Sequence, residues 1–253
     1  MFFRRAVIII AKYCPVVIKK RLIYTSALSW YYRKKQKRRM ATEQFDVLDR
    51  TGRKTGALIG RDDAHAAGVW HGAFHCLMIY GREGRGYALF QKRSGEKKIA
   101  AGKFDVSVGG HYAAGEDARS AGPREISEEL GLTIAFPDLV SLGRRIFVYC
   151  FAPGISENEF QDVFLLPLER RPETLILQEG EVDAVLEMEI EQGVELFSGT
   201  TTSATGRMTG IDGAESSVSV TIADFVPCED RYYHDLLQLA RRYLQGDREA
   251  MVI

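Results

Sequence analysis

The feature that most constrains this chain is a cluster of glutamates in the segment GGHYAAGEDARSAGPREISEELGL. Glu125, Glu128 and Glu129 are spaced i, i+3 and i+4, so they share one face if the segment is helical. Gly131 follows them as a typical left-handed helix end. Three carboxylates on one face repel each other, and Arg124 neutralises only part of their charge. The spacing therefore predicts either a solvated acidic face or a site for a divalent cation such as Mg²⁺ or Mn²⁺.

The residues around the cluster favour the cation site. Gly110 and Glu116 precede the run Arg124–Leu132 at the intervals G-x5-E-x7-R-E-U-x-E-E-x-G-U, where U is a bulky apolar residue. This pattern resembles the Nudix box at every defining position. The resemblance implies an α/β fold, an αβα sandwich around a mixed β-sheet. It also implies an enzyme that hydrolyses a diphosphate linkage with Mg²⁺ or Mn²⁺ as cofactor.

The same resemblance assigns roles within the motif. Glu125, Glu128 and Glu129 are implied to bind the metal, and Glu128 and Glu129 are also candidates for catalysis. Arg124 is implied to orient a glutamate, and Gly110 to let the backbone approach phosphate. These roles fit the chemistry, because metal ions screen the oxygens around phosphorus and lower the pKa of bound water. A nearby carboxylate can then take the proton of the attacking water.

A second set of candidates lies outside the motif. The segments FDVSVGGHYAAGE, WHGAFH and ENEFQDVF resemble parts of isopentenyl diphosphate isomerase, a branch of the same family, in which they supply metal-binding histidines and glutamates. By position, the implied metal ligands here are His71, His111, Glu157 and Glu159. His65 is a fifth candidate, although its spacing to His71 differs by one residue. Each of these side chains could instead occupy an ordinary hydrogen-bonded or solvated strand position.

The residue before the Gly-His pair distinguishes two activities. The isomerase uses a cysteine there to move protons on carbon, whereas this chain has Gly109. The missing thiol favours hydrolysis, for which Glu159, Glu157 and Glu181 are candidate catalytic bases. An isopentenyl diphosphate isomerase-like enzyme and a non-catalytic diphosphate-binding module are the two alternatives.

The group attached to the diphosphate is not identified by the sequence. Trp70, Tyr112 and the small, polar segment 198–210 are candidates for contacting the substrate, and we expect that segment to be a mobile loop. Their composition leaves nucleoside, sugar-nucleotide, prenyl and other organic diphosphates open.

Periodicity predicts the elements that carry these residues. Strands are expected over 45–48, 71–80, 87–93, 103–110, 144–152 and 159–168, and a strand or short helix over 181–190. Helical spacing predicts a closing helix over 230–246. Proline is tolerated at the first turn of a helix and disruptive inside it, so the glutamate helix is expected to start or kink at Pro123. Glu116, which precedes that proline, would then be less firmly placed.

Residues 1–39 differ from the rest of the chain. They hold 12 of its 34 Lys and Arg residues and no Asp or Glu, and their apolar runs are far shorter than the ~20 residues of a membrane helix. We expect a basic N-terminal extension, which is a targeting segment, a dispensable or artefactual stretch, or a functional arm. A single Nudix hydrolase domain is expected over 40–253. The expected location is cytoplasmic, or mitochondrial or another organelle if the extension is a transit peptide.

The remaining chain is acidic, which excludes nucleic acid as a general partner. Its cysteines are far apart and form no C-x-x-C pair, so neither a cysteine zinc site nor a disulfide framework is predicted. The expected partner is a small-molecule diphosphate, without stable membrane insertion. The resemblance also leaves a homodimer open.

Overall fold

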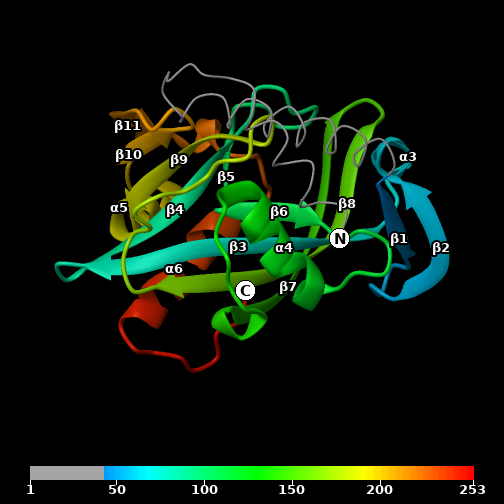
Figure 1. Ribbon diagram of the computed structural model, residues 1–253, viewed down its shortest axis with the longest axis horizontal. Coiled ribbons are helices and arrows are strands. Elements are labelled where there is room, and N and C mark those ends of the chain that lie inside the picture. Colours follow the sequence, from blue (N-terminus) through cyan, green and yellow to red (C-terminus); the bar gives the residue numbers. More distant parts are fainter. Residues whose placement is uncertain (1–42) are drawn as a thin grey trace, which may run out of the picture. The chain divides into compact units, whose positions relative to one another are not determined.

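A computed structural model describes residues 43–253 (Figure 1). The predicted extension over 1–39 lies outside the described residues, so its nature and the division of the chain at residue 40 stay predictions. No helix among residues 43–253 is both long and apolar enough to cross a lipid bilayer.

The described part of the chain contains eleven strands and four α-helices. The strands are β1 (Gln44–Leu48), β2 (Lys54–Gly60), β3 (His71–Arg82), β4 (Arg85–Arg93), β5 (Phe104–Asp105), β6 (Val108–His111), β7 (Val140–Ala152), β8 (Ile155–Leu168), β9 (Val182–Glu189), β10 (Ala204–Gly210) and β11 (Glu215–Val220). The helices are α3 (Arg61–Ala67), α4 (Ala118–Leu130), α5 (Ile190–Ser198) and α6 (Tyr232–Leu244), with short 3₁₀ turns at Phe136–Asp138 and Ile222–Asp224.

The strands form one large mixed sheet and one small ribbon. The order in the large sheet is β11-β10-β9-β4-β3-β8-β7, with β5 paired to β4 and β6 paired to β3. The pairing of β3 with β8 is parallel and the other strand pairs are antiparallel. The strands β1 and β2 pair only with each other.

Alternation along β3 divides the core into two layers. Phe74 and Met78 pack with Ile126 of α4 on one face of the sheet. Leu77 and Ile79 pack on the other face with residues of α5 and α6. Successive strand side chains point to opposite faces, so a fully buried strand needs a helix on each side. The predicted α/β sandwich around a mixed sheet is confirmed, and Figure 1 shows α4 and α6 on either side of β3.

The helix α4 begins five residues before the proline, so the prediction that it starts at Pro123 is wrong. Asp117 caps it: its carboxylate accepts from the Ser120 N–H at 3.0 Å, and the Ser120 hydroxyl accepts from the Asp117 N–H at 3.1 Å. This reciprocal capping box satisfies two N–H groups that would otherwise lack partners. Gly122 is also required, because a Cβ there would lie 2.7 Å from the ring of Phe74. The helix does end at Gly131, in the left-handed conformation, as predicted.

Two other segments differ from prediction. The expected strand over 103–110 is split into β5 and β6, because the chain crosses there from β4 to β3. Ser107 occupies the crossing, where its hydroxyl accepts from the Met78 N–H at 2.7 Å and donates to the Leu89 carbonyl. The expected loop over 198–210 is largely β10, which pairs with both β9 and β11. Segment 181–190 resolves as the strand β9 followed by α5.

Candidate active site

Arg124 gathers three carboxylates around itself. Its Nε and Nη2 donate to the two oxygens of Glu116 at 2.8 and 2.7 Å. Its Nη1 donates to Glu125 at 2.7 Å and to Glu128 at 3.1 Å. Glu116 also accepts from the backbone N–H of Ala113 at 3.0 Å, so it is firmly held, contrary to the expectation from Pro123. We call Glu116, Glu125, Glu128 and Glu129 with Arg124 the helix carboxylate group.

Two members of the helix carboxylate group are buried against β6. Glu125 and Glu129 are 9% and 4% exposed. A Cβ at Gly110 would lie 2.3 Å from the Glu125 carboxyl carbon, so only glycine fits there without displacing that side chain. Glu129 accepts from the side-chain amide of Gln91 at 3.2 Å and approaches the N–H of Gly109 at 3.4 Å.

Burial disfavours the ionised form of Glu125 and of Glu129. It raises the pKa of Glu125 to about 7, against the influence of Arg124. It also raises the pKa of Glu129 well above its usual value, and the nearby Glu125 adds to the effect. Burying an ionised carboxylate is costly unless a cation or hydrogen-bond donors compensate it. The pair is therefore suited to holding a hard divalent cation.

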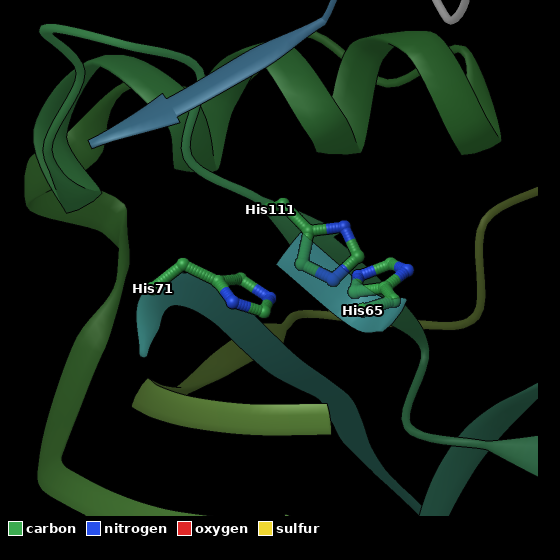
Figure 2. Close-up of side chains that lie close together, drawn as sticks. All are labelled: His65, His71 and His111. Carbon is green, nitrogen blue, oxygen red and sulfur yellow. The ribbon is translucent and has the colours of Figure 1, made fainter. Parts of the chain in front are cut away.

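A second group of titratable side chains lies on the opposite face of β3 and β6. Figure 2 shows His65 from α3, His71 from β3 and His111 from β6 with their rings turned toward one another. The ring centroids are 5.0–5.4 Å apart. His111 also joins Glu157 and Glu159 of β8, and its Nε2 lies 2.9 Å from Glu159 Oε1. In each of the two triads, possible ligand atoms lie within 4.8 Å of one another. We call these five residues the His/Glu group.

Strand register brings the His/Glu group together. His71 is directly opposite Glu159 in the β3–β8 pairing, and Ala73 is opposite His111 in the β3–β6 pairing. Residues two apart on a strand share a face, so all these side chains emerge on one side. Phe45 of β1 covers them, with its ring centroid 4.8 Å from that of His71 and 4.9 Å from that of His111. Phe45 is fully buried, so it shields the group from water.

The tautomer of His71 shows that the His/Glu group fits a cation. Its Nδ1 lies 2.8 Å from the Val69 carbonyl, which can only accept, so Nδ1 carries the proton. In the neutral ring Nε2 is then a lone pair, 3.6 Å from the Glu159 carboxylate. The Nε2 atoms of His65 and His71 are both buried without a hydrogen-bond partner. Metal-binding histidines commonly donate their other ring N–H to a carbonyl in this way.

The protonation states also match those of metal ligands. Burial lowers the pKa of His65 to about 4 and that of His111 well below its usual value, so both rings are neutral near pH 7. Burial acts to raise the pKa of Glu159, but the hydrogen bond from His111 and the nearby ring of His71 lower it well below the usual value. Burial, with the charge of Glu159, raises the pKa of Glu157 to about 8. Neutral imidazoles and an ionised carboxylate are the forms that bind a divalent ion.

The two groups adjoin through β6. Gly109 and Gly110 contact glutamates of α4, whereas the side chain of the next residue, His111, belongs to the His/Glu group. The His111 carbonyl also accepts from Arg124 at 3.4 Å. A substrate reaching both groups would therefore lie along the backbone of this glycine pair.

Tyr112 and Trp70, two of the predicted substrate-contacting residues, do not line a common pocket. Tyr112 lines a pocket of about 110 Å³ together with Glu116 and Phe160, and its hydroxyl donates to Asp162 at 2.9 Å. Trp70 packs on Phe160 with ring centroids 4.9 Å apart and does not line that pocket. Segment 198–210, as the strand β10, is constrained by pairing on both sides.

Sequence reasoning missed two cations beside the acidic residues. The charge of Arg93 lowers the pKa of both Glu129 and Glu157, so it acts on both groups. Its Nη2 donates to the Ile99 carbonyl at 3.1 Å, while its Nε is buried without a partner. Lys97 forms an ion pair with Glu181, one of the candidate bases. The basic run QKRSGEKK, which begins within the strand β4, was the available signal.

Fold and site together define a class of protein: an α/β enzyme that presents clustered carboxylates and imidazoles along a glycine-rich strand. The comparisons with known proteins agree. The NUDIX domain model matches residues 69–202, which is more than half of the chain, so the chain belongs to the Nudix family. With Nudix hydrolases among its relatives, it is a Nudix hydrolase, a hydrolase of the pyrophosphatase type.

Relatives from both branches of the family are found. An uncharacterized Nudix hydrolase of Clostridium acetobutylicum is 29% identical over 203 residues, covering 79% of this chain and 97% of the relative. Nudix hydrolase 3 of Arabidopsis thaliana is 35% identical over 157 residues, 58% of this chain but 19% of the plant protein. An isopentenyl-diphosphate Delta-isomerase of Aliivibrio fischeri is 29% identical over 166 residues, covering 62% and 90%. A crystal structure of a Deinococcus radiodurans protein aligns with a TM-score of 0.48 and 18% identity, covering 79% and 98%.

Proposed function

We propose that the chain hydrolyses the diphosphate linkage of an organic diphosphate, with Mg²⁺ or Mn²⁺ bound by Glu125, Glu128 and Glu129. The observation that carries this proposal is the burial of Glu125 and Glu129, with raised pKa values, on one face of a helix. Nudix family membership supports the same assignment, since divalent metals are general in the family.

The residues of the helix carboxylate group have different roles in this reaction. A bound cation supplies charge screening and a bound water of lowered pKa. Arg124 holds Glu125 and Glu128 in place through its hydrogen bonds, and Gly110 leaves the backbone accessible to phosphate oxygens. Glu128, whose side chain is 37% exposed, can be reached by water and is placed to accept its proton, with Glu159 as the other candidate base.

We further propose a second cation at the His/Glu group, held by His71, His111, Glu157 and Glu159 with His65 as a fifth ligand. The support is that the Nε2 atoms of His65 and His71 are buried without a hydrogen-bond partner, and that His71 Nε2 lies 3.6 Å from the Glu159 carboxylate. Imidazole nitrogens and carboxylate oxygens together suit Mn²⁺ or another transition metal better than Mg²⁺, which prefers oxygen ligands alone.

The His/Glu group also supports a second candidate, an isopentenyl diphosphate isomerase-like activity. The resemblance stated above places metal-binding histidines and glutamates at these positions, and isomerases are among the relatives. Against it stands Gly109, which provides no thiol where the isomerase has one. Proton exchange between the two pentenyl diphosphates in heavy water would establish the isomerase, and its absence at high enzyme concentration excludes it.

The test of the main proposal is a phosphate-release screen of the full chain with Mg²⁺ and with Mn²⁺. The panel contains nucleoside di- and triphosphates, dinucleotides, sugar nucleotides and prenyl diphosphates. We expect metal-dependent turnover of at least one class, abolished by Glu129→Gln and unchanged by Glu83→Gln in the β3–β4 turn. Full activity of Glu129→Gln would show that the metal assignment is wrong, and ligand binding without turnover would indicate a binding module.

Three further expectations stay predictions. They are a homodimer, the exclusion of nucleic acid as partner, and a cytoplasmic or organellar location.

A further inference from the structure

His75 is a buried histidine that belongs to neither group. It lies on β3 on the same face as His71 and Ala73, and it is 9% exposed. In the β3–β6 pairing it is directly opposite Gly109. Its Nδ1 lies 3.0 Å from the hydroxyl of Tyr232 at the start of α6. A polar ring in this position needs partners for both nitrogens, yet no hydrogen bond involves Nε2 among the described residues.

The contact with Tyr232 sets the tautomer of His75. Burial raises the pKa of Tyr232 well above its usual value, so the hydroxyl keeps its proton. That hydroxyl has no other hydrogen-bond partner among residues 43–253, so a proton on His75 Nδ1 would leave the buried O–H without an acceptor. Burial also lowers the pKa of His75, although Asp105 and Glu159 oppose the shift while Arg145 and Arg93 assist it. The ring is therefore neutral, and Nε2 carries its only N–H.

Gly109 leaves room for at least a methyl group beside the ring of His75. A Cβ at Gly109 would lie 3.6 Å from both Nε2 and Cδ2 of His75, which is ordinary contact distance. Any side chain there would stand in front of the ring. Gly109 also approaches Glu129 through its N–H and is two residues from His111, so this space adjoins both acidic groups.

We propose that His75 contacts the substrate, donating a hydrogen bond from Nε2 to an oxygen of the bound diphosphate, with Tyr232 as the residue that positions it. The inference rests on the proposed hydrolase function. A neutral donor suits this place, because burial disfavours the imidazolium form of His75. Preorganised donors of this kind contribute most where the surroundings exclude water.

Two substitutions of His75 separate contact with substrate from structural support. The amide nitrogen of glutamine can take the place of Nε2, whereas the shorter asparagine reaches only the place of Nδ1 and keeps the contact with Tyr232. If His75 contacts the substrate, His75→Gln retains turnover within about tenfold of wild type, and His75→Asn loses about 100-fold in kcat. A purely structural role predicts the reverse, with His75→Asn the more active and the more stable, and that ranking would overturn the proposal.

Gly109→Ala tests the same contact from the other side. Its methyl group meets no atom closer than 3.6 Å, so we expect unchanged thermal stability and a loss of about tenfold or more in kcat/KM. Gly81→Ala in β3 is the matched control, because its nearest neighbour would be 3.9 Å away and it lies at the far end of the strand. Equal activities of Gly109→Ala and Gly81→Ala would contradict the proposal. Tyr232→Phe should lower kcat without changing the amount of Mn²⁺ bound.

A binding readout separates this inference from the proposed function. In protein with ¹⁵N-labelled histidine, inorganic pyrophosphate with Mg²⁺ should shift the Nε2 resonance of His75 and leave that of His234 unchanged. If no substrate on the panel is turned over, the hydrolase proposal fails and the resonance shift still decides the contact. If Glu129→Gln abolishes turnover and the His75 resonance does not move, the contact is wrong and the hydrolase stands.

Discussion

The helix carboxylate group and the His/Glu group are both acidic, and they differ in where their positive charge comes from. Arg124 provides the first with a resident cation that forms hydrogen bonds to three of its glutamates. No lysine or arginine among residues 43–253 forms an ion pair with Glu157 or Glu159 of the second. The first group therefore has an internal cation that offsets part of its charge, whereas the second has none among the described residues.

The largest effect expected from this difference is that of Arg124→Met. It leaves Glu116, Glu125 and Glu128 without their shared cation, and unpairing buried charges typically costs 3–5 kcal/mol. We expect the free energy of unfolding, measured in urea, to fall by about 4 kcal/mol. The control is Arg144→Met, which also breaks a bidentate pair, with Asp162, but at a side chain that is 47% exposed. That change should cost about 1 kcal/mol or less.

A double variant checks the cause. Adding Glu125→Gln to Arg124→Met replaces the buried carboxyl group that has lost its partner by a neutral amide. Part of the lost free energy of unfolding should therefore return. If both variants are equally unstable, the arginine acts by packing and the comparison between the two groups loses its basis.

Metal removal should show the complementary behaviour of the His/Glu group. Mn²⁺ at a hundredfold excess over Kd stabilises a folded protein by about 2.7 kcal/mol. We expect chelation to remove this gain, and Glu157→Gln to weaken Mn²⁺ binding about tenfold, which lowers the gain by about 1.4 kcal/mol. Without metal, Glu157→Gln should be at least as stable as wild type, because burial raises the pKa of Glu157 to about 8, so a neutral amide replaces a mostly protonated carboxyl group and no hydrogen bond is broken. Denaturant titrations with and without Mn²⁺ measure both quantities.

The opposite effects of Glu157→Gln on stability with and without Mn²⁺ are the sharpest test of the difference between the two groups. Glu83→Gln, in the exposed turn between β3 and β4, is the matched charge-neutralising control and should change neither value. If Glu157→Gln destabilises the metal-free protein, Glu157 has a structural partner, and its role is not to bind an ion.

The two groups also differ in how far the sequence predicts them. Glu125, Glu128, Glu129 and Arg124 lie within one turn and a half of helix, so their spacing alone places them on one face. His71, His111 and Glu159 meet only through the β3–β6 and β3–β8 registers. A shift of one residue would turn a whole strand's side chains to the other face, and nothing local in the sequence specifies that register. Resemblance, not spacing, identified this second set.

Two predictions were wrong because they were made from the local sequence alone, whereas the structure at both places depends on residues elsewhere in the chain. Pro123 suggested a helix start, but Asp117 and Ser120 form a capping box upstream, and Phe74 explains the adjacent Gly122. Segment 198–210 suggested a loop because it is small and polar. In the fold Gly206 permits close packing on β9, since a Cβ there would lie 2.5 Å from Leu186. Glycine reads as a turn in a sequence, although it can equally mark a close approach between strands.

Gly110 provides a smaller test of the comparison, by overpacking. A methyl group at Gly110 would lie 2.3 Å from the Glu125 carboxyl carbon, so the glutamate must move. We expect Gly110→Ala to cost about 2 kcal/mol in the free energy of unfolding and to reduce turnover more than Gly109→Ala does. The part of its Mn²⁺-dependent stabilisation that comes from the His/Glu group should stay close to that of wild type, because His111 faces the other side of β6. Loss of that stabilisation would mean that the two groups share one ion.

The smallest effect is expected at the helix cap. Asp117→Ala removes the carboxylate that accepts from the Ser120 N–H, and loss of an N-cap typically costs about 1 kcal/mol. Asp117→Asn keeps an acceptor and should cost about half as much or less. The first turn of α4 lies next to Glu116, so fraying there should loosen the Arg124 pairs and lower kcat modestly. It should leave the part of the Mn²⁺-dependent stabilisation that comes from the His/Glu group unchanged, since none of that group is carried by α4. Calorimetry with and without Mn²⁺ separates these readouts. A cap variant that weakened Mn²⁺ binding at the His/Glu group would show that the helix positions both groups, and that their apparent independence across β6 is wrong.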